Sequence, residues 1–478
     1  MSLQINSNFQ GSGLPNIYDA YYSYAGGSAS VSNDVRGTIG SNWGDDITFS
    51  LGFYTELFRL ASFSGGSGYD RVSIVGNGAA DLADVTGVEA FDLLGVGHTT
   101  MPDSVFAGIA PSASDLSLRE ISVTMSMGSS KGFPVLDASA VAAGHNINLK
   151  LSYPMNVTLG AGDDVISGSD IFNYRRIHGG LGVDTLYHTE VTDSYYGYFG
   201  TPQQSSNVDG VGIYRFSDSS GEHYSFSDDN FAGITGNVII ASLGAMGGTL
   251  SGSTLSASNA LWLYGSAAQD ALSGGAADDM FGFSAATLGS SDAVAGGAGH
   301  DQLLLLAGVG AFAIGGVSGV EYYQLSGAGS VALTDANFAS VTGALGVRLL
   351  AGGTVDASAV MAGHALMVIG GGTGDHLIGC AGDDIFSLLG GPSGGTTVVG
   401  GGGNDLVLFP SGASGGLAGL SGVEFYDLSQ GTANSVTIAD TNVAGLAAFG
   451  MQAGNGGDRF DLAGLTDFGV MHYLFFTH

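Results

Sequence analysis

The chain has one cysteine, few prolines and few basic residues, and each shortage excludes a class of protein. Cys380 alone cannot form an intrachain disulfide, so a disulfide framework and a cysteine-based zinc site are both excluded. Lys and Arg number 11 against 43 Asp and Glu, and the resulting formal charge of −32 argues against a nucleic-acid partner. With 8 prolines, and 84 glycines that follow no collagen period, the chain is neither collagen-like nor a proline-rich disordered tract.

Leader and membrane signals are also missing. Residues 1–13, MSLQINSNFQGSG, lack a basic region and an apolar core, so we expect no cleaved signal peptide. The uncharged run of 18 residues at 303–320 directly follows a Gly-Asp turn, and its counterpart later in the chain contains Pro410. We interpret this run as a solenoid coil, and the sequence predicts no transmembrane segment.

Glycine and short apolar strands are what the chain has in abundance. Apolar residues make up 44%, which is enough for a continuous core. Short runs such as residues 405–409, DLVLF, alternate in the manner of half-buried strands, while the glycines suit tight turns. Helix signals are limited to single turns, in which we expect Asp335 and Asp440 to act as N-caps.

A pair of Gly-Asp turns recurs four times in the same order. The first turn reads WGDDITF, AGDDVIS, AADDMFG and AGDDIFS, and the second reads GGSGYDRV, GGLGVDTL, GGAGHDQL and GGGGNDLV. Within pairs the second acid of the first turn and the acid of the second lie 24, 20, 22 and 21 residues apart, and the pairs step by 118, 115 and 105 residues. Strands such as SGVEFYDL and turns such as TDANFASV recur with them. A unit of this length corresponds to about five coils of roughly 20 residues.

The spacing predicts an all-β fold, a right-handed parallel β-helix or β-roll solenoid. Residues 39–460 divide into about four superrepeats, at about 39–156, 157–271, 272–376 and 377–460. Residues 1–38, with the cluster IYDAYYSY, are predicted to form an N-terminal cap or interaction segment, and residues 461–478 a C-terminal tail. The insertion at 188–207, with aromatic residues from Tyr195 to Phe199, is either a contact surface or a loop packed on its own coil.

The excess of carboxylates favours a bound cation. Most of the 43 acids can find no basic partner, and stacked coils would place aspartates of the Gly-Asp turns close together. A hard cation that accepts six or more oxygens relieves this repulsion, and calcium tolerates irregular geometry better than magnesium does.

The turns resemble the calcium-binding nonapeptide GGxGxDxUx of the RTX (repeats-in-toxin) β-roll. In that family the sixth-position Asp supplies side-chain oxygens and the glycine-rich turn supplies carbonyls. The resemblance implies several Ca²⁺ ions held by Asp46, Asp70, Asp164, Asp184, Asp270, Asp279, Asp301, Asp375, Asp384, Asp405 and Asp458. Two tandem copies, 270 with 279 and 375 with 384, have the nine-residue period of the roll, whereas Ala277 and Thr373 replace fourth-position glycines. The alternative is a set of plain Gly-Asp β-turns without an ion.

The dilute pairs, each followed by a strand such as VEFYDL, are more similar to calcium-dependent bacterial S-layer proteins of the RTX class than to toxin arrays. This resemblance implies an extracellular, self-assembling cell-surface protein, exported by a type I system without a cleaved leader. An RTX adhesin or ligand-binding module is the main alternative, and a polysaccharide-active β-helix enzyme is a further one. The expected partners are the chain itself and, after it, cell-surface polysaccharide.

Matches to catalytic motifs in this sequence are no more than chance predicts. The GxSxG matches around Ser393 and Ser414 are expected by chance in so glycine-rich a chain. His145 and His364 share a repeat position, which favours packing over catalysis. The turn acids recur along the chain, whereas a glycosidase needs one pair in one cleft. We therefore predict that the chain is not an enzyme.

Overall fold

The structure, a computed structural model, describes residues 27–32, 45–50, 57–59 and most of residues 63–476. The longest gaps within that last stretch are residues 112–118, 127–133, 169–175 and 189–202. The aromatic clusters of residues 17–24 and 195–199 lie outside the described residues. The chain forms two compact units, Met1–Ala241 (unit 1) and Ser242–His478 (unit 2).

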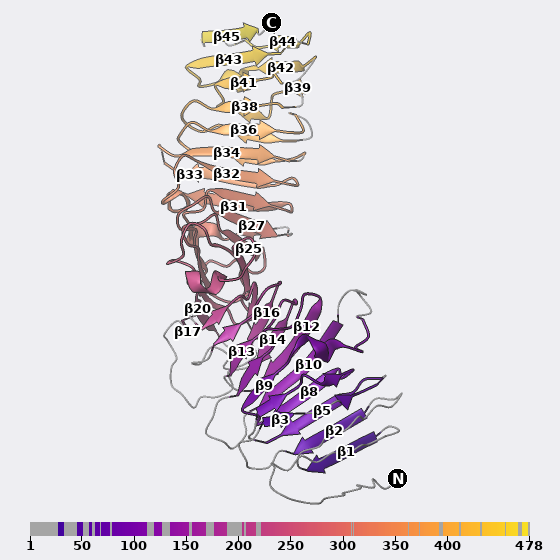
Figure 1. The fold of residues 1–478 in the computed structure, drawn as a ribbon. Coiled ribbons are helices and arrows are strands. Elements are labelled where there is room, and N and C mark those ends of the chain that lie inside the picture. Colours follow the sequence, from indigo (N-terminus) through magenta and orange to yellow (C-terminus); the bar gives the residue numbers. More distant parts are fainter. Residues whose placement is uncertain are drawn as a thin grey trace, which may run out of the picture. The chain divides into compact units, whose positions relative to one another are not determined.

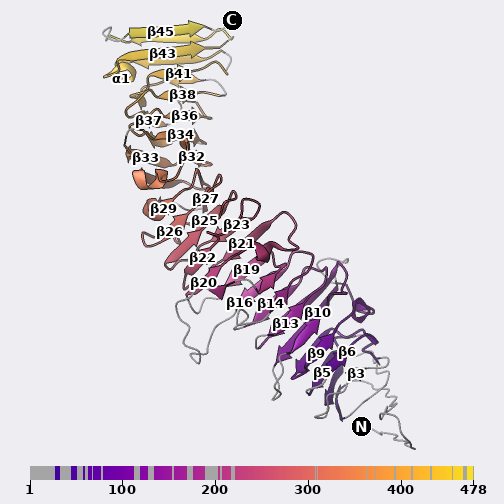
Figure 2. The same cartoon turned by 60° about the vertical axis from the view of Figure 1, so that its left-hand side comes forward.

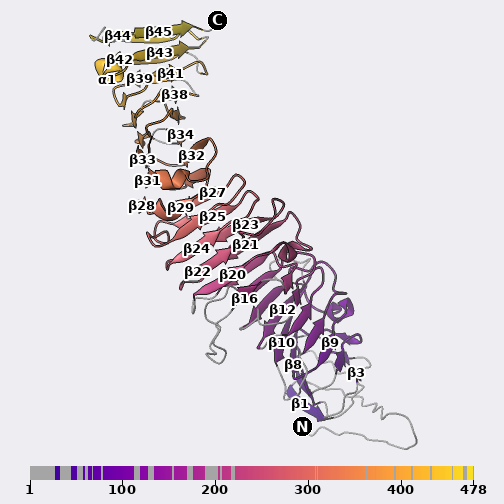
Figure 3. The same ribbon diagram turned by 90° about the vertical axis from the view of Figure 1, so that its left-hand side faces the viewer.

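Unit 1 contains two main sheets whose strands pair in parallel (Figures 1 and 3). The long sheet contains β1 (Gly27–Ser32), β2 (Asp45–Ser50), β5 (Arg71–Val75), β8 (Ala90–Leu94), β10 (Arg119–Ser126), β12 (His145–Leu151), β14 (Val165–Gly168), β16 (Thr185–His188) and β19 (Ile213–Phe216). The other contains β3 (Leu57–Arg59), β6 (Ala79–Asp81), β9 (His98–Thr100), β11 (Val135–Asp137), β13 (Asn156–Thr158), β15 (Ile177–His178) and β18 (Val208–Asp209). The long sheet continues to β21 (Val238–Ser242), which pairs with β19 and ends at the unit boundary. The remaining strands are β4 (Phe63–Ser64), β7 (Val85–Thr86), β17 (Gln203–Gln204) and β20 (Glu222–Ser225).

Unit 2 repeats this plan, and its long sheet is seen as a stack of strands in Figure 2. That sheet contains β23 (Ala260–Tyr264), β25 (Met280–Ser284), β27 (Gln302–Leu306), β30 (Tyr322–Leu325), β32 (Ala344–Leu349), β34 (Ala365–Gly370), β36 (Ile385–Leu388), β38 (Leu406–Leu408), β41 (Phe425–Asp427), β43 (Ala448–Ala453) and β45 (Met471–Phe476). Three further sheets form the other sides of the coils. The first contains β22 (Gly248–Ser251), β24 (Asp270–Ser273), β26 (Ala293–Ala295) and β29 (Val317–Ser318), and the second contains β28 (Gly310–Phe312), β31 (Gly329–Thr334), β33 (Thr354–Ala359), β35 (His376–Ile378), β37 (Thr397–Val399) and β40 (Leu420–Ser421). The third contains β39 (Ser414–Gly416), β42 (Ser435–Ala439) and β44 (Arg459–Gly464).

The core of unit 2 follows from strand register. Each strand of the long sheet alternates inward and outward residues, and parallel pairing without slippage stacks the inward ones in a column. One such column is fully buried and contains Phe281, Leu303, Tyr323, Val347, Val368, Phe386, Val407 and Tyr426. Full burial of each such side chain stabilises the fold by about 1.5–3 kcal/mol, so the predicted continuous core is present.

Short helical turns close the coils at the recurring DxxF segments. They are η1 (Asp103–Phe106), η2 (Asp228–Phe231), η4 (Asp335–Phe338) and α1 (Asp440–Val443), and a further short turn is η3 (Ile314–Gly316). The prediction that Asp335 and Asp440 are N-caps is wrong, because the cap positions are Thr334 and Ala439. Asn at the third helical position satisfies the cap instead, since its short amide reaches back to the cap N–H.

The buried Asn of these turns links neighbouring coils. Asn337 Oδ1 accepts the N–H of Thr334 at 2.9 Å, and its Nδ2 donates to the carbonyls of Ile314 at 2.7 Å and Val317 at 3.0 Å. Asn442 makes the same set of contacts, and Asn230 makes the same cap contact and one cross-coil bond. All three are fully buried, so each amide satisfies backbone groups that water cannot reach.

The prediction of an all-β, parallel β-solenoid is confirmed. The uncharged run at 303–320 contributes to β27, β28, η3 and β29, as expected of a solenoid coil. Within the described part of the chain, no helix has the length and apolar character needed to cross a bilayer.

Candidate functional site in the Gly-Asp turns

The predicted ligands lie at the turns that precede strands, and most of them point inward. Nine are at most 2% exposed, namely Asp70, Asp164, Asp184, Asp270, Asp279, Asp301, Asp375, Asp384 and Asp405. Asp458 is half-buried. Asp46 lies in β2 in register with Arg71, and its side chain is not among those described. The sequence pattern located these residues correctly in turns, but it gave no sign of their burial.

The buried carboxylates form a ladder from coil to coil. In unit 2 the N–H of Leu261 donates to Asp279 Oδ1 at 2.6 Å, and the N–H of Asp279 donates to Asp301 Oδ1 at 2.8 Å. The N–H of Asp301 then donates to Glu321 Oε2 at 2.8 Å. Each acid therefore fixes the backbone of the coil before it, and a glutamate completes the series.

The same ladder recurs one superrepeat later. Asp384 Oδ1 accepts the N–H of Leu366 at 2.8 Å, Asp405 Oδ1 accepts that of Asp384 at 2.9 Å, and Glu424 Oε2 accepts that of Asp405 at 2.8 Å. The glutamate of the recurring VE-aromatic strand thus has a defined position, which the sequence analysis had noted only as a landmark. In unit 1 the N–H of Asp70 likewise donates to Glu89 Oε2 at 2.7 Å.

The tandem copies nine residues apart do not share one row. Asp279 precedes the long-sheet strand β25, whereas Asp270 begins β24 in another sheet, and Asp384 and Asp375 are divided in the same way. The N–H of Asp270 donates to Asp292 Oδ1 at 2.8 Å. Asp292 is buried too, and sequence reasoning missed it because no glycine motif precedes it.

In unit 2 the two kinds of turn differ at the second carboxylate oxygen. In the first turns, Asp279 Oδ2 accepts the N–H of Gly275 at 2.6 Å, and Asp384 Oδ2 accepts that of Cys380 at 2.6 Å. In the second turn, Oδ2 of Asp184, Asp301 and Asp405 is buried without a hydrogen-bond partner in the described structure. In unit 1 they do not differ, because Oδ2 of the first-turn acid Asp164 is also buried without a hydrogen-bond partner in the described structure. Three GGxGxD turns therefore each hold an oxygen whose burial is not compensated.

Burial perturbs the ionisation of these acids. It raises the pKa of Asp184 to about 8 and the pKa values of Asp301 and Asp405 to about 7 each. The neighbouring ladder carboxylates raise these pKa values further, and the accepted N–H bonds lower them. Burial in this fold thus favours the protonated form, because an ionised carboxylate is poorly solvated there.

A carbonyl oxygen of the next coil approaches each of these unpartnered carboxylate oxygens. A Cβ added to Gly296 would lie 2.4 Å from Asp301 Oδ2 and 1.7 Å from Gly319 O. At Gly400 the corresponding distances are 2.4 Å to Asp405 Oδ2 and 1.8 Å to the next carbonyl. The first glycine of GGxGxD is therefore required whether or not an ion binds, because any side chain would collide with both oxygens.

The oxygen atoms of these turns are of the type that calcium binds. A carboxylate oxygen and a turn carbonyl that converge are the oxygen ligands calcium prefers, although it takes six to eight of them. Among the described residues no three His, Cys, Asp or Glu side chains are grouped as a metal site. Asp184, Asp301 and Asp405 would therefore each hold an ion together with turn carbonyls rather than with other carboxylates.

The first acid of each GDD turn has a separate role. Asp278 is exposed, and its Oδ1 accepts the N–H of His300 in the next coil at 2.8 Å. Asp383 does the same for Asn404 at 2.8 Å, and Asp163 for Val183 at 2.8 Å. These surface acids secure the turn that follows, a function that sequence reasoning did not assign to them.

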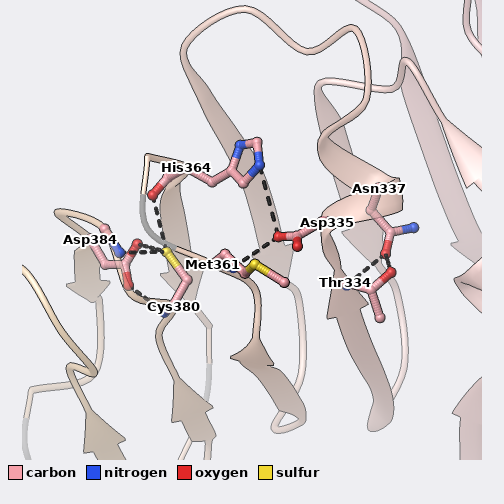
Figure 4. Close-up of polar contacts among 8 residues, drawn as sticks. Thr334, Asp335, Asn337, Met361, His364, Cys380 and Asp384 are labelled. Atoms are coloured by element: carbon pink, nitrogen blue, oxygen red, sulfur yellow. Dashed lines mark hydrogen bonds and ion pairs between the residues drawn. The ribbon is translucent and has the colours of Figure 1, made fainter.

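Cys380 occupies the position of the second glycine in its turn (Figure 4). Its buried thiol donates to Asp384 Oδ1 at 3.0 Å, and burial raises the thiol pKa to about 12. The only cysteine of the chain is thus a free, buried thiol.

The two repeat-related histidines pack against phenylalanines. His145 stacks on Phe106 with ring centroids 4.6 Å apart, and its Nδ1 lies 2.6 Å from Asp103. His364 packs on Phe338 at 4.7 Å, and its Nε2 lies 3.8 Å from Asp335 Oδ1 (Figure 4).

A surface hollow of unit 2 is lined by small residues from 310 to 374, mostly glycines, and carries no titratable side chain.

Comparison of the chain with protein-family models, with curated proteins and with solved structures gave no match. The RTX resemblance therefore rests on the turn motifs alone.

Proposed function

We propose that the chain is a calcium-stabilised structural solenoid that assembles with itself at a bacterial cell surface, as an S-layer or similar array component. The observation that carries the proposal is the uncompensated carboxylate oxygen of the GGxGxD turns, next to a carbonyl of the following coil. A cation at this place would hold Asp184, Asp301 and Asp405 in the ionised form that burial alone disfavours.

Calcium would then control folding as well as local geometry. Because binding energy at a site absent from the unfolded chain is folding energy, the solenoid would be much more stable where calcium is plentiful. This suits a protein that is exported unfolded by a type I system and folds outside the cell. A charge of −32 also keeps calcium-free chains apart, and bound cations reduce that repulsion.

A structural role is favoured over catalysis by the repetition of the site. The ladder of Asp279, Asp301 and Glu321 has the same arrangement as that of Asp384, Asp405 and Glu424, whereas an enzyme needs one distinct constellation. An adhesin for cell-surface polysaccharide is the second candidate, and it would bind glycan as a monomer.

Electron microscopy of the purified chain with EGTA and with millimolar calcium tests the proposal. We expect ordered sheets or filaments only with calcium. A folded chain that stays monomeric at high concentration in calcium would contradict the array and favour the adhesin.

A further inference from the structure

The outward face of the long sheet in unit 2 carries a row of uncharged residues, seven of which have apolar or aromatic side chains. Strand register places one outward residue from each of ten strands, β23 to β43, in a single line. This line, termed the apolar column, consists of Trp262, Met280, Gln302, Tyr322, Gly346, Met367, Ile385, Leu406, Phe425 and Gly450. It has no charged member, and Trp262 and Met367 are each 38% exposed.

The same sheet face in unit 1 is polar. Its corresponding line consists of Arg71, Ala90, Ser122, Asn148, Val165, Thr185 and Ile213. The adjacent line there contains Asp92, Lys150 and Arg215. The solenoid therefore folds with polar residues at these positions, so the apolar column is not needed for the fold. A contiguous exposed apolar surface of this kind marks an interaction site.

Charge in the two outward lines is confined to one complementary pair of positions. The outward line beside the apolar column contains Tyr264, Gly282, Leu304, Gln324, Arg348, Ile369, Ser387, Leu408, Asp427 and Gln452. Arg348 on β32 and Asp427 on β41 are its only charges. In the order of the sheet both strands lie two places from β36, on opposite sides of it.

We propose that this face docks on the same face of a second copy of the chain, in an antiparallel pair with a two-fold axis along β36. The inference rests on the proposed self-assembly and assigns a surface to it. A two-fold axis parallel to the strands places each line of one copy opposite the same line of the other copy, with the order of the strands reversed. Arg348 of each copy then faces Asp427 of the other, Met367 faces Leu406, and Ile385 meets its own counterpart.

The size of the face suits a pair of this kind. The overlapping strands β27 to β45 span about 38 Å at about 4.8 Å per strand, and the two outward lines give a width of about 14 Å. Each copy would bury about 500 Å², so that the pair buries about 1,000 Å² in total, the area from which specific protein interfaces begin. A chain of net charge −32 repels itself over most of its surface, and here the two facing charges attract.

Charge reversal and its reciprocal test the arrangement. Sedimentation of the full chain in millimolar calcium would compare wild type with Arg348→Asp, Asp427→Arg and the double variant. Each single reversal should weaken association by about tenfold or more, because it places like charges opposite each other, and the double variant should restore it. Asp427 Oδ1 also accepts the N–H of Ser429 at 2.8 Å, so far-UV spectra must show that Asp427→Arg is folded.

Met367→Lys provides a readout independent of that pair, with Ser122→Lys on the polar face of unit 1 as its matched control. Met367→Lys should weaken association by about tenfold, and Ser122→Lys should leave it unchanged. If wild type associates and none of these variants alters the association, the docking face alone is overturned. The same holds if the double variant fails to restore the association that the single reversals weaken. A wild-type chain that does not associate in calcium would overturn both the face and the proposed function.

Discussion

Replacing Asp301 by Asn should stabilise the chain without calcium and lose that advantage when calcium is present. Asp301 is buried, its Oδ1 accepts the N–H of Asp279, and its Oδ2 has no hydrogen-bond partner in the described structure. Burial raises its pKa from 3.8 to about 7. At about 1.4 kcal/mol per pKa unit, keeping this carboxylate ionised in the calcium-free fold at pH 8 costs up to about 4 kcal/mol.

The amide of Asn retains the Oδ1 acceptor and removes that charge. Its Nδ2 would also lie where Asp301 Oδ2 and Gly319 O converge, so that it can donate to the carbonyl. Without calcium at pH 8 we therefore expect Asp301→Asn to be more stable than wild type, by about 2–4 kcal/mol. With calcium the variant loses one ligand, and an ion present at about 100 times its Kd stabilises wild type alone by about 2.7 kcal/mol, which offsets most or all of that gain.

Thermal unfolding in EGTA and in millimolar calcium measures both effects. Asp278→Asn is the matched control, because Asp278 is exposed and also accepts a backbone N–H, from His300. It should shift the melting temperature little in either buffer. If Asp301→Asn lowers the melting temperature equally in both buffers, its carboxylate is only a backbone acceptor and the argument for calcium at this turn fails.

Three further predictions concern pH, the buried asparagine and the turn glycine. In EGTA the folded-state pKa values of Asp184, about 8, and of Asp405, about 7, exceed the ordinary 3.8, so the native state holds extra protons and stability should fall as pH rises from about 4 to about 8. A calcium-free melting temperature that rises over this range would contradict the burial of protonated acids. Asn337→Ala should lower the free energy of unfolding in urea by about 2–4 kcal/mol, because it leaves three buried backbone groups without a hydrogen-bond partner. Asn404→Ala, at an exposed position, should lower it by under about 0.5 kcal/mol. Equal losses would show that the amide does not link coils. Gly296→Ala should destabilise by more than about 2 kcal/mol since its Cβ would lie 1.7 Å from Gly319 O, whereas Gly315→Ala meets nothing within 4 Å and should be tolerated. Similar stability of the two variants would contradict the close approach of neighbouring coils at Gly296.

The repeat made the fold predictable from sequence, because stacked coils of nearly constant length fix both strand order and register. Phe281, Leu303 and Tyr323 share a column for this reason alone. The positions of Asp279 and Asp301 in turns were also readable, since the Gly-Asp pattern marks the turn.

The orientation of the acids was not readable. A Gly-Asp turn has the same residues whether its carboxylate faces solvent, binds an ion or accepts an N–H from the preceding coil. Asp384 and Asp405 make long-range contacts of the last kind, 18 and 21 residues from their donors, and no local pattern encodes these. Asn337 was passed over because Asn is common in ordinary turns, and Glu321 because its partner lies in another coil.

A calcium titration of the purified chain at pH 8, followed by far-UV circular dichroism and by labelling of the Cys380 thiol, tests the central claim most directly. The account predicts that calcium increases β-structure and suppresses labelling together, because Cys380 is buried only in the folded coil. A chain that shows full β-structure and a protected thiol in excess EGTA, unchanged when calcium is added, would contradict it.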